Sequence, residues 1–136
     1  MELNEAEKIL NESGYMIVED VDYENLTSGT RVKNDFDAVF GPVIKFCKQN
    51  DIEVSFPDKK RFTMRVKLPN GSTGTLQADM RFGNTKFDGW RLTIEDNDMD
   101  YYNRYGVFPD ICFSADSTQD LYKRFDRAMH YHDNEN

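Results

Sequence analysis

Three aspartates at alternate positions, Asp96, Asp98 and Asp100, have the spacing with which a calcium-binding loop of the EF-hand kind begins. A working loop of that kind needs a glycine at its sixth position and a bidentate glutamate at its twelfth. Those positions here hold Tyr101 and Val107, and a strand pattern rather than a helical one precedes the loop. The sequence therefore favours an exposed acidic loop over a cation site.

Three tyrosines lie in the same loop, Tyr101, Tyr102 and Tyr105. Tyrosine beside carboxylates is typical of protein-recognition surfaces, because its ring supplies contact area at a low cost in side-chain entropy. The alternative is that these rings cover an edge of the core. On the first interpretation, the three aspartates and the three tyrosines form a binding site for a protein with a basic surface.

A basic surface is the second candidate site. Residues 59–91 carry eight basic and two acidic side chains, whereas the whole chain has a net charge of −8. Because alternate side chains of a strand share a face, five residues are expected together on one face of a sheet: Arg61, Arg65, Lys67, Arg81 and Arg91. Such a face can bind nucleic acid or a phosphate ligand. The aromatic residues of these strands are predicted to point inward, away from any base that would stack.

Strand pairing decides whether these arginines need a partner. In one register Arg61, Arg81 and Arg91 lie directly opposite one another, and like charges in that position are destabilising. The row would then require an anion from a ligand or partner. A shift of the first hairpin by two residues pairs Arg61 with Asp79 instead. The carboxylates that can then neutralise the arginines within the chain are Asp79, Asp88 and Glu95.

The remaining polar residues do not indicate catalysis or metal binding. His130 and His132 are two positions apart on a predicted helix, so they point in different directions. The serines fall in predicted turns and caps, which leaves no nucleophile–base pair. The pair Pro57-Asp58, followed by basic residues, invites comparison with metal-dependent nucleases, but the acidic residue expected one position before a lysine on the next strand is absent. We therefore expect neither an enzyme nor a cofactor.

An antiparallel meander of strands must position both candidate surfaces. Apolar and polar residues alternate, as half-buried strands require, in four stretches: 52–56, 61–68, 75–82 and 90–95. Because apolar side chains must face apolar ones, the connections within 69–73 and 83–89 are expected to hold odd numbers of residues, with Phe82 opposite Trp90. The apolar side of the pattern also includes Phe56.

Apolar residues at helical spacing predict helices that cover the apolar face of this sheet. The predicted helices are residues 3–13, a segment from Asn34 or Asp35 to Gln49, and a last segment that begins after Asp116 or Ser117. Pro42 predicts a kink or a break at Gly41 in the second helix. A fifth strand is expected within 107–115. The predicted fold class is therefore α+β, with an antiparallel meander of four to five strands and three helices mainly covering one face.

Length and composition favour a single domain over residues 1–131 and a frayed polar tail at 132–136. Neither a membrane-spanning apolar run nor a signal-peptide pattern is present, so we expect a cytoplasmic protein without a membrane partner. The two cysteines, Cys47 and Cys112, lie in apolar segments and are expected to be reduced and buried. A net charge of −8 argues against general affinity for nucleic-acid backbones, and the oligomeric state is left open.

The opening residues resemble the start of many small cytosolic proteins of tailed phages and mobile elements. The residues that carry this likeness are Leu3-Asn4-Glu5-Ala6, Leu10 and Gly14-Tyr15. In size and acidity the chain is also similar to anti-CRISPR-like inhibitors, which use carboxylates where a host defence nuclease expects phosphates. The resemblance implies an accessory protein that inhibits a basic, nucleic-acid-binding protein. It implies no fold and no catalytic residue.

Overall fold

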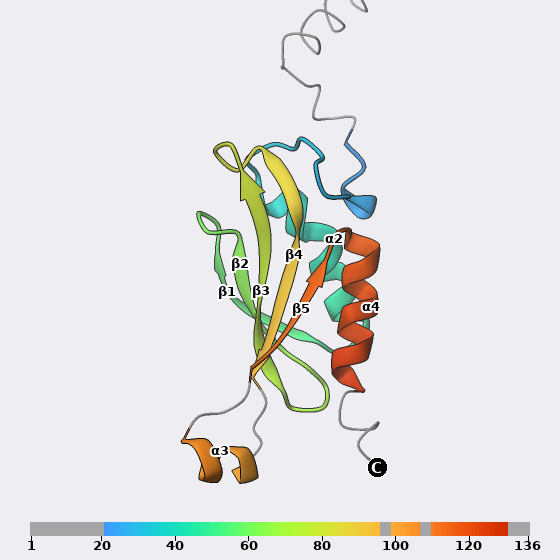
Figure 1. Ribbon diagram of the computed structural model, residues 1–136. Helices are drawn as coiled ribbons and strands as arrows, with labels where there is room; N and C mark the ends of the chain where they lie inside the picture. Colours follow the sequence, from blue (N-terminus) through green and yellow to red (C-terminus); the bar gives the residue numbers. More distant parts are fainter. Residues whose placement is uncertain (1–20, 96–98, 107–109, 131–136) are drawn as a thin grey trace, which may run out of the picture.

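The computed structural model describes residues 21–95, 99–106 and 110–130. Five strands form one antiparallel sheet in the order in which they follow along the chain (Figure 1). They are β1 (Glu53–Asp58), β2 (Thr63–Lys67), β3 (Thr73–Arg81), β4 (Lys86–Glu95) and β5 (Asp110–Ala115). Helices α2 (Phe36–Gln49) and α4 (Thr118–Met129) cover one face of the sheet. The predicted α+β meander is confirmed, whereas the predicted helix at 3–13 and the tail at 132–136 lie outside the described residues.

Both covering helices begin at a predicted cap. The side chains of Asp35 and Ser117 accept hydrogen bonds from backbone N–H groups in the first turns of α2 and α4, an arrangement that contributes about 1 kcal/mol to each helix. Helix α2 runs through Pro42 without the break expected at Gly41. Buried residues on both sides of the proline hold the helix against the sheet, so the loss of one backbone donor is tolerated.

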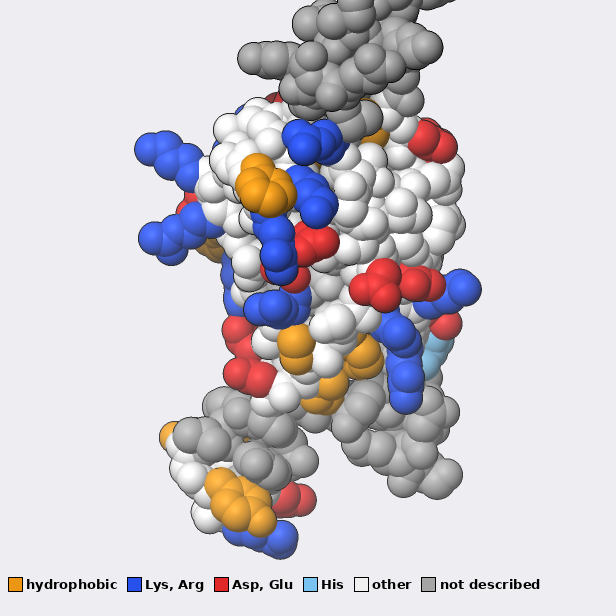
Figure 2. Space-filling view, turned by 45° about the horizontal axis from the view of Figure 1, so that its top comes forward, with side chains coloured by type: hydrophobic (Ala, Val, Ile, Leu, Met, Phe, Trp, Pro, Cys, Tyr) orange, Lys and Arg blue, Asp and Glu red, His pale blue; other side chains and the backbone are white. Residues whose placement is uncertain are grey.

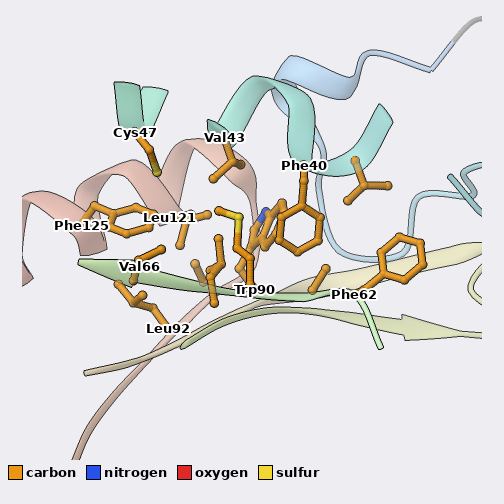
Figure 3. Close-up of a cluster of buried hydrophobic side chains, with 14 of the residues drawn as sticks. Phe40, Val43, Cys47, Phe62, Val66, Trp90, Leu92, Leu121 and Phe125 are labelled. Atoms are coloured by element: carbon orange, nitrogen blue, oxygen red, sulfur yellow. The ribbon is translucent and has the colours of Figure 1, made fainter. Parts of the chain in front are cut away.

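The core lies between the sheet and the two helices, with Trp90 near its centre. The Trp90 ring packs edge-on against Phe40, at 5.0 Å between ring centroids, and against Phe87, at 5.4 Å. Its Nε1 donates to the Oγ1 atom of Thr118 at 3.1 Å, which satisfies a buried polar group. Figure 3 shows side chains from α2, α4 and the sheet pointing into this single cluster.

The first hairpin adopts the register that is shifted by two residues, with Val66 opposite Gly74. The backbone N–H of Leu68 donates to the carbonyl of Ser72 at 2.8 Å, which leaves residues 69–71 as the loop. The expected odd loop length is therefore confirmed. The expectation rested on keeping apolar side chains on one face. That condition fixes whether the loop length is odd or even, but it does not distinguish registers that are two residues apart.

The second hairpin differs from the prediction. Trp90 lies opposite Ala78 rather than Phe82, and the strands are joined by a four-residue turn at 82–85. A bulge at Gly89, which has φ +112°, adds one residue to β4. The even turn and the extra residue together keep apolar side chains on one face, which is why the parity argument alone gave the wrong pairing.

Two phenylalanines that were expected in the core are on the surface. Phe56 is 81% exposed at φ +49°, and Phe82 is 70% exposed at φ +53°. Strand β1 does not end before Pro57 but continues to Asp58 through an irregularity that includes Phe56. A left-handed residue interrupts the alternation of faces along a strand. For that reason the alternating pattern placed both side chains on the wrong side.

Residues 29–32 complete the edge of the sheet where β5 does not reach. Strand β5 pairs only with residues 90–95 of β4. At the beginning of β4, backbone hydrogen bonds of 2.7–2.8 Å join residues 29–32 to residues 85–87. This pairing was not predicted from the sequence, and it places Arg31 opposite Lys86.

Candidate functional site

The connection between β4 and β5 carries a short helix, α3 (Met99–Tyr105), where the sequence indicated a loop. Gly106 follows it at φ +77°, and its N–H donates to the carbonyl of Tyr102 at 2.7 Å, which is a common way for a helix to end. Asp100 in the first turn and Arg104 in the last turn match the helix dipole. Gly106 after the helix, and the acidic first turn and basic last turn, are sequence signals of a helix that the prediction of a loop did not take into account.

Helix α3 exposes three apolar or aromatic side chains. The exposed fractions are 55% for Met99, 40% for Tyr102 and 59% for Tyr105. A spacing of three residues places them on one side of the helix. Figure 1 shows α3 beyond the end of the sheet, apart from α2 and α4. At these exposures the two tyrosines do not cover an edge of the core.

The described part of the chain contains half of the predicted protein-binding residues, and it brings them together on α3: Asp100, Tyr102 and Tyr105. Asp96 and Asp98 lie outside the described residues. Tyr101 is part of α3, but only its backbone is described. Met99 belongs to the same surface and was not predicted, because the sequence pattern of this stretch indicated a loop and not a helix with an exposed face.

This end of the sheet is acidic. Glu95 and Asp110, where the chain leaves β4 and enters β5, lie directly opposite each other, and Arg65 offsets their repulsion with hydrogen bonds of 2.8 and 3.3 Å to Glu95. The Arg65 hydrogen bonds hold the pKa of Glu95 below its ordinary value. Residues 95–110 contain five acidic side chains and one basic one, a net charge of −4. We refer to Glu95, residues 99–106 and Asp110 as the α3 end.

The predicted row of arginines across the outer sheet face does not form. Arg91 lies opposite Gln77, and Arg81 lies opposite Lys86, because of the bulge and the four-residue turn. Each arginine of the predicted site instead has a carboxylate nearby: Arg61–Asp58 at 3.8 Å, Arg65–Glu95 at 2.8 Å, Arg81–Asp88 at 2.6 Å and Arg91–Asp79 at 3.6 Å. Lys67, the fifth residue, is exposed and lies opposite Thr73. The face is thus neutralised largely within the chain.

The opposite end of the sheet gathers cations. The turn at 59–62 meets the turn at 82–85, where Asn84 Nδ2 donates to the carbonyl of Lys60 at 3.2 Å. We refer to these two turns and the charged side chains around them as the hairpin end. Its basic members are Arg31, Lys59, Lys60, Arg61, Arg81 and Lys86, and its acidic members are Asp35, Asp37, Asp58 and Asp88. Figure 2 shows Lys and Arg side chains grouped at this end around an exposed hydrophobic side chain.

Phe82 is the exposed aromatic residue of the hairpin end. Lys86 Nζ lies 5.6 Å from the centroid of its ring, within the range of a cation–π interaction. A left-handed backbone costs an L-residue about 1–2 kcal/mol, and an exposed ring gains little from the hydrophobic effect. Beyond this cation–π contact, folding gains little from phenylalanine here, and Phe56 is likewise exposed at a left-handed residue.

The other candidate groups are separated or buried. Within the described ranges, no cluster of three His, Cys, Asp or Glu side chains could hold a metal ion. Nε2 of His130 lies 3.7 Å from Oδ1 of Asp126, and His132 is outside those ranges. An open hollow of about 630 Å³ runs along β1 and has no such cluster in its wall. No helix in the described residues has the length and apolar character to span a membrane.

The two cysteines have different environments and are not joined. Cys47 is buried in the core, and burial raises the pKa of its thiol to about 12. Cys112 was predicted to be buried but is exposed, because β5 turns Ile111 and Phe113 inward and alternates the residue between them outward.

The two ends are thus distinct in charge and in the aromatic residues that they expose. Comparison of the chain with protein-family models found no matching family, and comparisons with curated proteins and with solved structures returned no significant match. Any functional conclusion about these surfaces therefore comes from their own geometry and charge.

Proposed function

We propose that the protein is a non-enzymatic interaction module that binds a protein with a basic surface through its α3 end. The observation that carries the proposal is the exposed face of α3, on which Met99, Tyr102 and Tyr105 lie at three-residue spacing. Tyrosine and methionine are enriched in the cores of protein–protein interfaces. A helix that displays them beyond the sheet can enter a groove on a partner.

Charge gives this surface a preferred kind of partner. The net charge of −4 over residues 95–110 attracts a basic protein and orients the encounter, and this steering weakens as salt is added. Asp100 lies two residues before Tyr102, on a different side of α3 from the exposed rings, so its charge attracts the partner while the rings make the contact. A partner that normally binds nucleic acid has a basic surface of this kind, which makes inhibition of such a protein, for example a defence nuclease, the form of the proposal that we favour.

The alternative site, the basic sheet face, has less support. Arg65, Arg81 and Arg91 each have a carboxylate within 3.6 Å. A phosphate would have to compete with those carboxylates, and the predicted row that required an outside anion is absent. We propose a cytoplasmic setting for the interaction, where thiols are ordinarily reduced, and the separation of Cys47 from Cys112 supports it.

The test compares two matched triple variants in affinity capture from a cell lysate, at low and high salt. The first replaces Met99, Tyr102 and Tyr105 with alanine. Because alanine is the strongest helix former, α3 itself is preserved. The second replaces Phe82 with asparagine and both Lys60 and Lys86 with glutamine, which removes aromatic and charged groups at the far end. Thermal unfolding of both variants controls for folding.

The proposal predicts that a protein captured by the parent chain at low salt is retained by the hairpin-end variant and lost by the α3 variant. Asp100→Asn, which removes charge and keeps the rings, should weaken capture by less than the triple variant. Equal capture by the parent and the α3 variant would refute the proposed site. Capture that does not weaken with salt would refute the electrostatic part of it.

A further inference from the structure

The placement of Phe82 calls for an explanation outside folding. Its φ of +53° favours glycine or asparagine, and its 70% exposure favours a polar side chain. The turn that holds it is well ordered by hydrogen bonds: Thr85 N–H donates to the Arg81 carbonyl at 3.0 Å, and Thr85 Oγ1 donates to the Phe82 carbonyl at 2.6 Å. The backbone thus holds an aromatic ring outward at a position where stability alone disfavours one. Strain of this kind is concentrated at functional sites.

The surroundings of the ring define the chemistry of a partner. Among the described residues, Arg31, Lys60 and Lys86 have no carboxylate within ion-pair distance. Arg31 is paired with Lys86 through the backbone, and Lys60 is tied to the turn of Phe82 through Asn84. The backbone thus brings three cations without a carboxylate partner to the turn that carries one exposed ring, and the complementary ligand carries both negative charges and a flat apolar group.

A hollow between the turn at 59–62 and the turn at 82–85 provides room for such a ligand. It has a volume of about 490 Å³, is open to solvent, and lies between the two turns. Its wall includes the cations Lys60 and Arg61, the carboxylate of Asp58 that pairs with Arg61, and the hydrogen-bonding side chains of Gln77 and Asn84. The hollow therefore offers charge and polar contacts directly beside the turn that carries Phe82.

We propose that the hairpin end binds a short single-stranded nucleic acid. A base stacks on the ring face of Phe82 that Lys86 does not cover, and the adjoining phosphates contact Lys60, Lys86 and Arg31. Aromatic stacking platforms within a basic groove are the general means of binding single strands. This site is independent of the protein-binding site proposed at the α3 end, because the two share no residue.

Single-stranded rather than duplex nucleic acid is favoured on two grounds. Stacking on a side chain requires an unpaired base, which a duplex does not present. A duplex also carries a dense line of phosphates, and beyond the hairpin end these would meet a chain whose net charge is −8. The same acidity limits the bound segment to a few nucleotides at the hairpin end.

The test measures fluorescence anisotropy of a labelled oligothymidylate of about ten nucleotides, at low and at moderate salt. Four chains are compared: the parent, Phe82→Asn, the double variant Lys60→Gln with Lys86→Gln, and Tyr105→Ala as the control at the far end. Asparagine suits the left-handed backbone at position 82, so Phe82→Asn removes the ring without disturbing the turn. Unlabelled duplex of the same length and polyglutamate serve as competitors.

We expect the parent chain to bind the oligothymidylate, with Phe82→Asn losing about 5- to 140-fold in affinity, which is the value of one stacked base. The double lysine variant should bind more weakly and depend less on salt. Tyr105→Ala should bind as the parent does. Absence of binding at low salt, unchanged binding by Phe82→Asn, or stronger competition by duplex or polyglutamate than by the single strand would overturn the proposal. An intact protein interaction at the α3 end would be unaffected by any of these results.

Discussion

The two ends of the sheet display aromatic side chains in opposite ways. At the α3 end, Met99, Tyr102 and Tyr105 stand on a short helix inserted between two strands, in an acidic segment. At the hairpin end, Phe82 stands in a tight left-handed turn among cations. The net charge of −8 therefore describes the acidic α3 end but not the hairpin end. The charge is distributed unevenly along the sheet, and the two ends suit different partners.

The backbone accounts for the different displays. A helix can expose a side chain without a left-handed residue, and Met99, Tyr102 and Tyr105 are exposed in this way on α3. The hairpin end exposes Phe82 only through a strained residue and a bulge at Gly89. We therefore expect substitutions on the exposed side of α3 to leave the sheet unchanged, whereas substitution of Gly89 at the bulge should disturb it.

Among the substitutions that compare the two ends, Gly89→Ala is expected to change the free energy of unfolding most. A methyl group there would lie 2.9 Å from the carbonyl oxygen of Ala115, and the backbone is at φ +112°. We expect a loss of about 2–3 kcal/mol in the free energy of unfolding, measured by urea denaturation. Gly106→Ala is the matched control at the other end, because its φ is +77° but nothing lies near its added methyl group. Its loss should be about 1 kcal/mol, and equal losses in the two variants would contradict the role of the bulge.

A smaller effect of opposite sign is expected from Phe82→Asn. The substitution relieves left-handed strain but removes the contact with Lys86. The free energy of unfolding should rise by up to about 1 kcal/mol. Tyr105→Ala, at an exposed helical position, should change it by less than about 0.5 kcal/mol. A clear loss of stability in Phe82→Asn would mean that the ring is held outward for a structural reason.

The smallest effect is expected from Glu95→Gln, which removes the ion pair with Arg65. Because the pKa of Glu95 is lowered in the folded protein, its contribution to stability is present above the ordinary carboxyl pKa of 4.5 and is lost as the pH falls through the folded value. Both side chains are partly exposed, so about 0.5 kcal/mol is expected at pH 7. Denaturation of both proteins at pH 7 and at about pH 3 should show this difference disappearing in acid. A difference that persists in acid would rule out the charge as its cause.

Apolar alternation and helical stripes were sufficient to predict the meander, the two covering helices and their caps. Burial enforces those patterns, so they are visible in single residues such as Leu121 and Phe125 of α4. The parity of the first loop was also predictable, because only an odd loop keeps Val66 on the core side, whereas the even second turn was missed because the bulge at Gly89 restores the faces. The register was not predictable, since a shift of two residues leaves every side chain on the same face.

The candidate sites were less predictable than the fold. The tyrosine-rich segment was identified, but its helix was missed because α3 is short and has no buried stripe. The exposed rings of Phe56 and Phe82 were missed because positive φ values break the alternation on which the strand prediction depends. Ion pairs such as Arg91–Asp79 depend on the register and on the bulge, which a single sequence does not reveal.

We propose that a protein partner contacts the α3 end and not the hairpin end. Photo-cross-linking tests it directly, with p-benzoylphenylalanine placed at position 105 in one protein and at position 82 in another. Both positions are exposed and aromatic in the parent chain, at 59% and 70%, so the probes are matched. We expect a protein adduct from position 105 that is competed by unlabelled parent chain and is absent from position 82. The same adduct from position 82, or none from position 105, would contradict it.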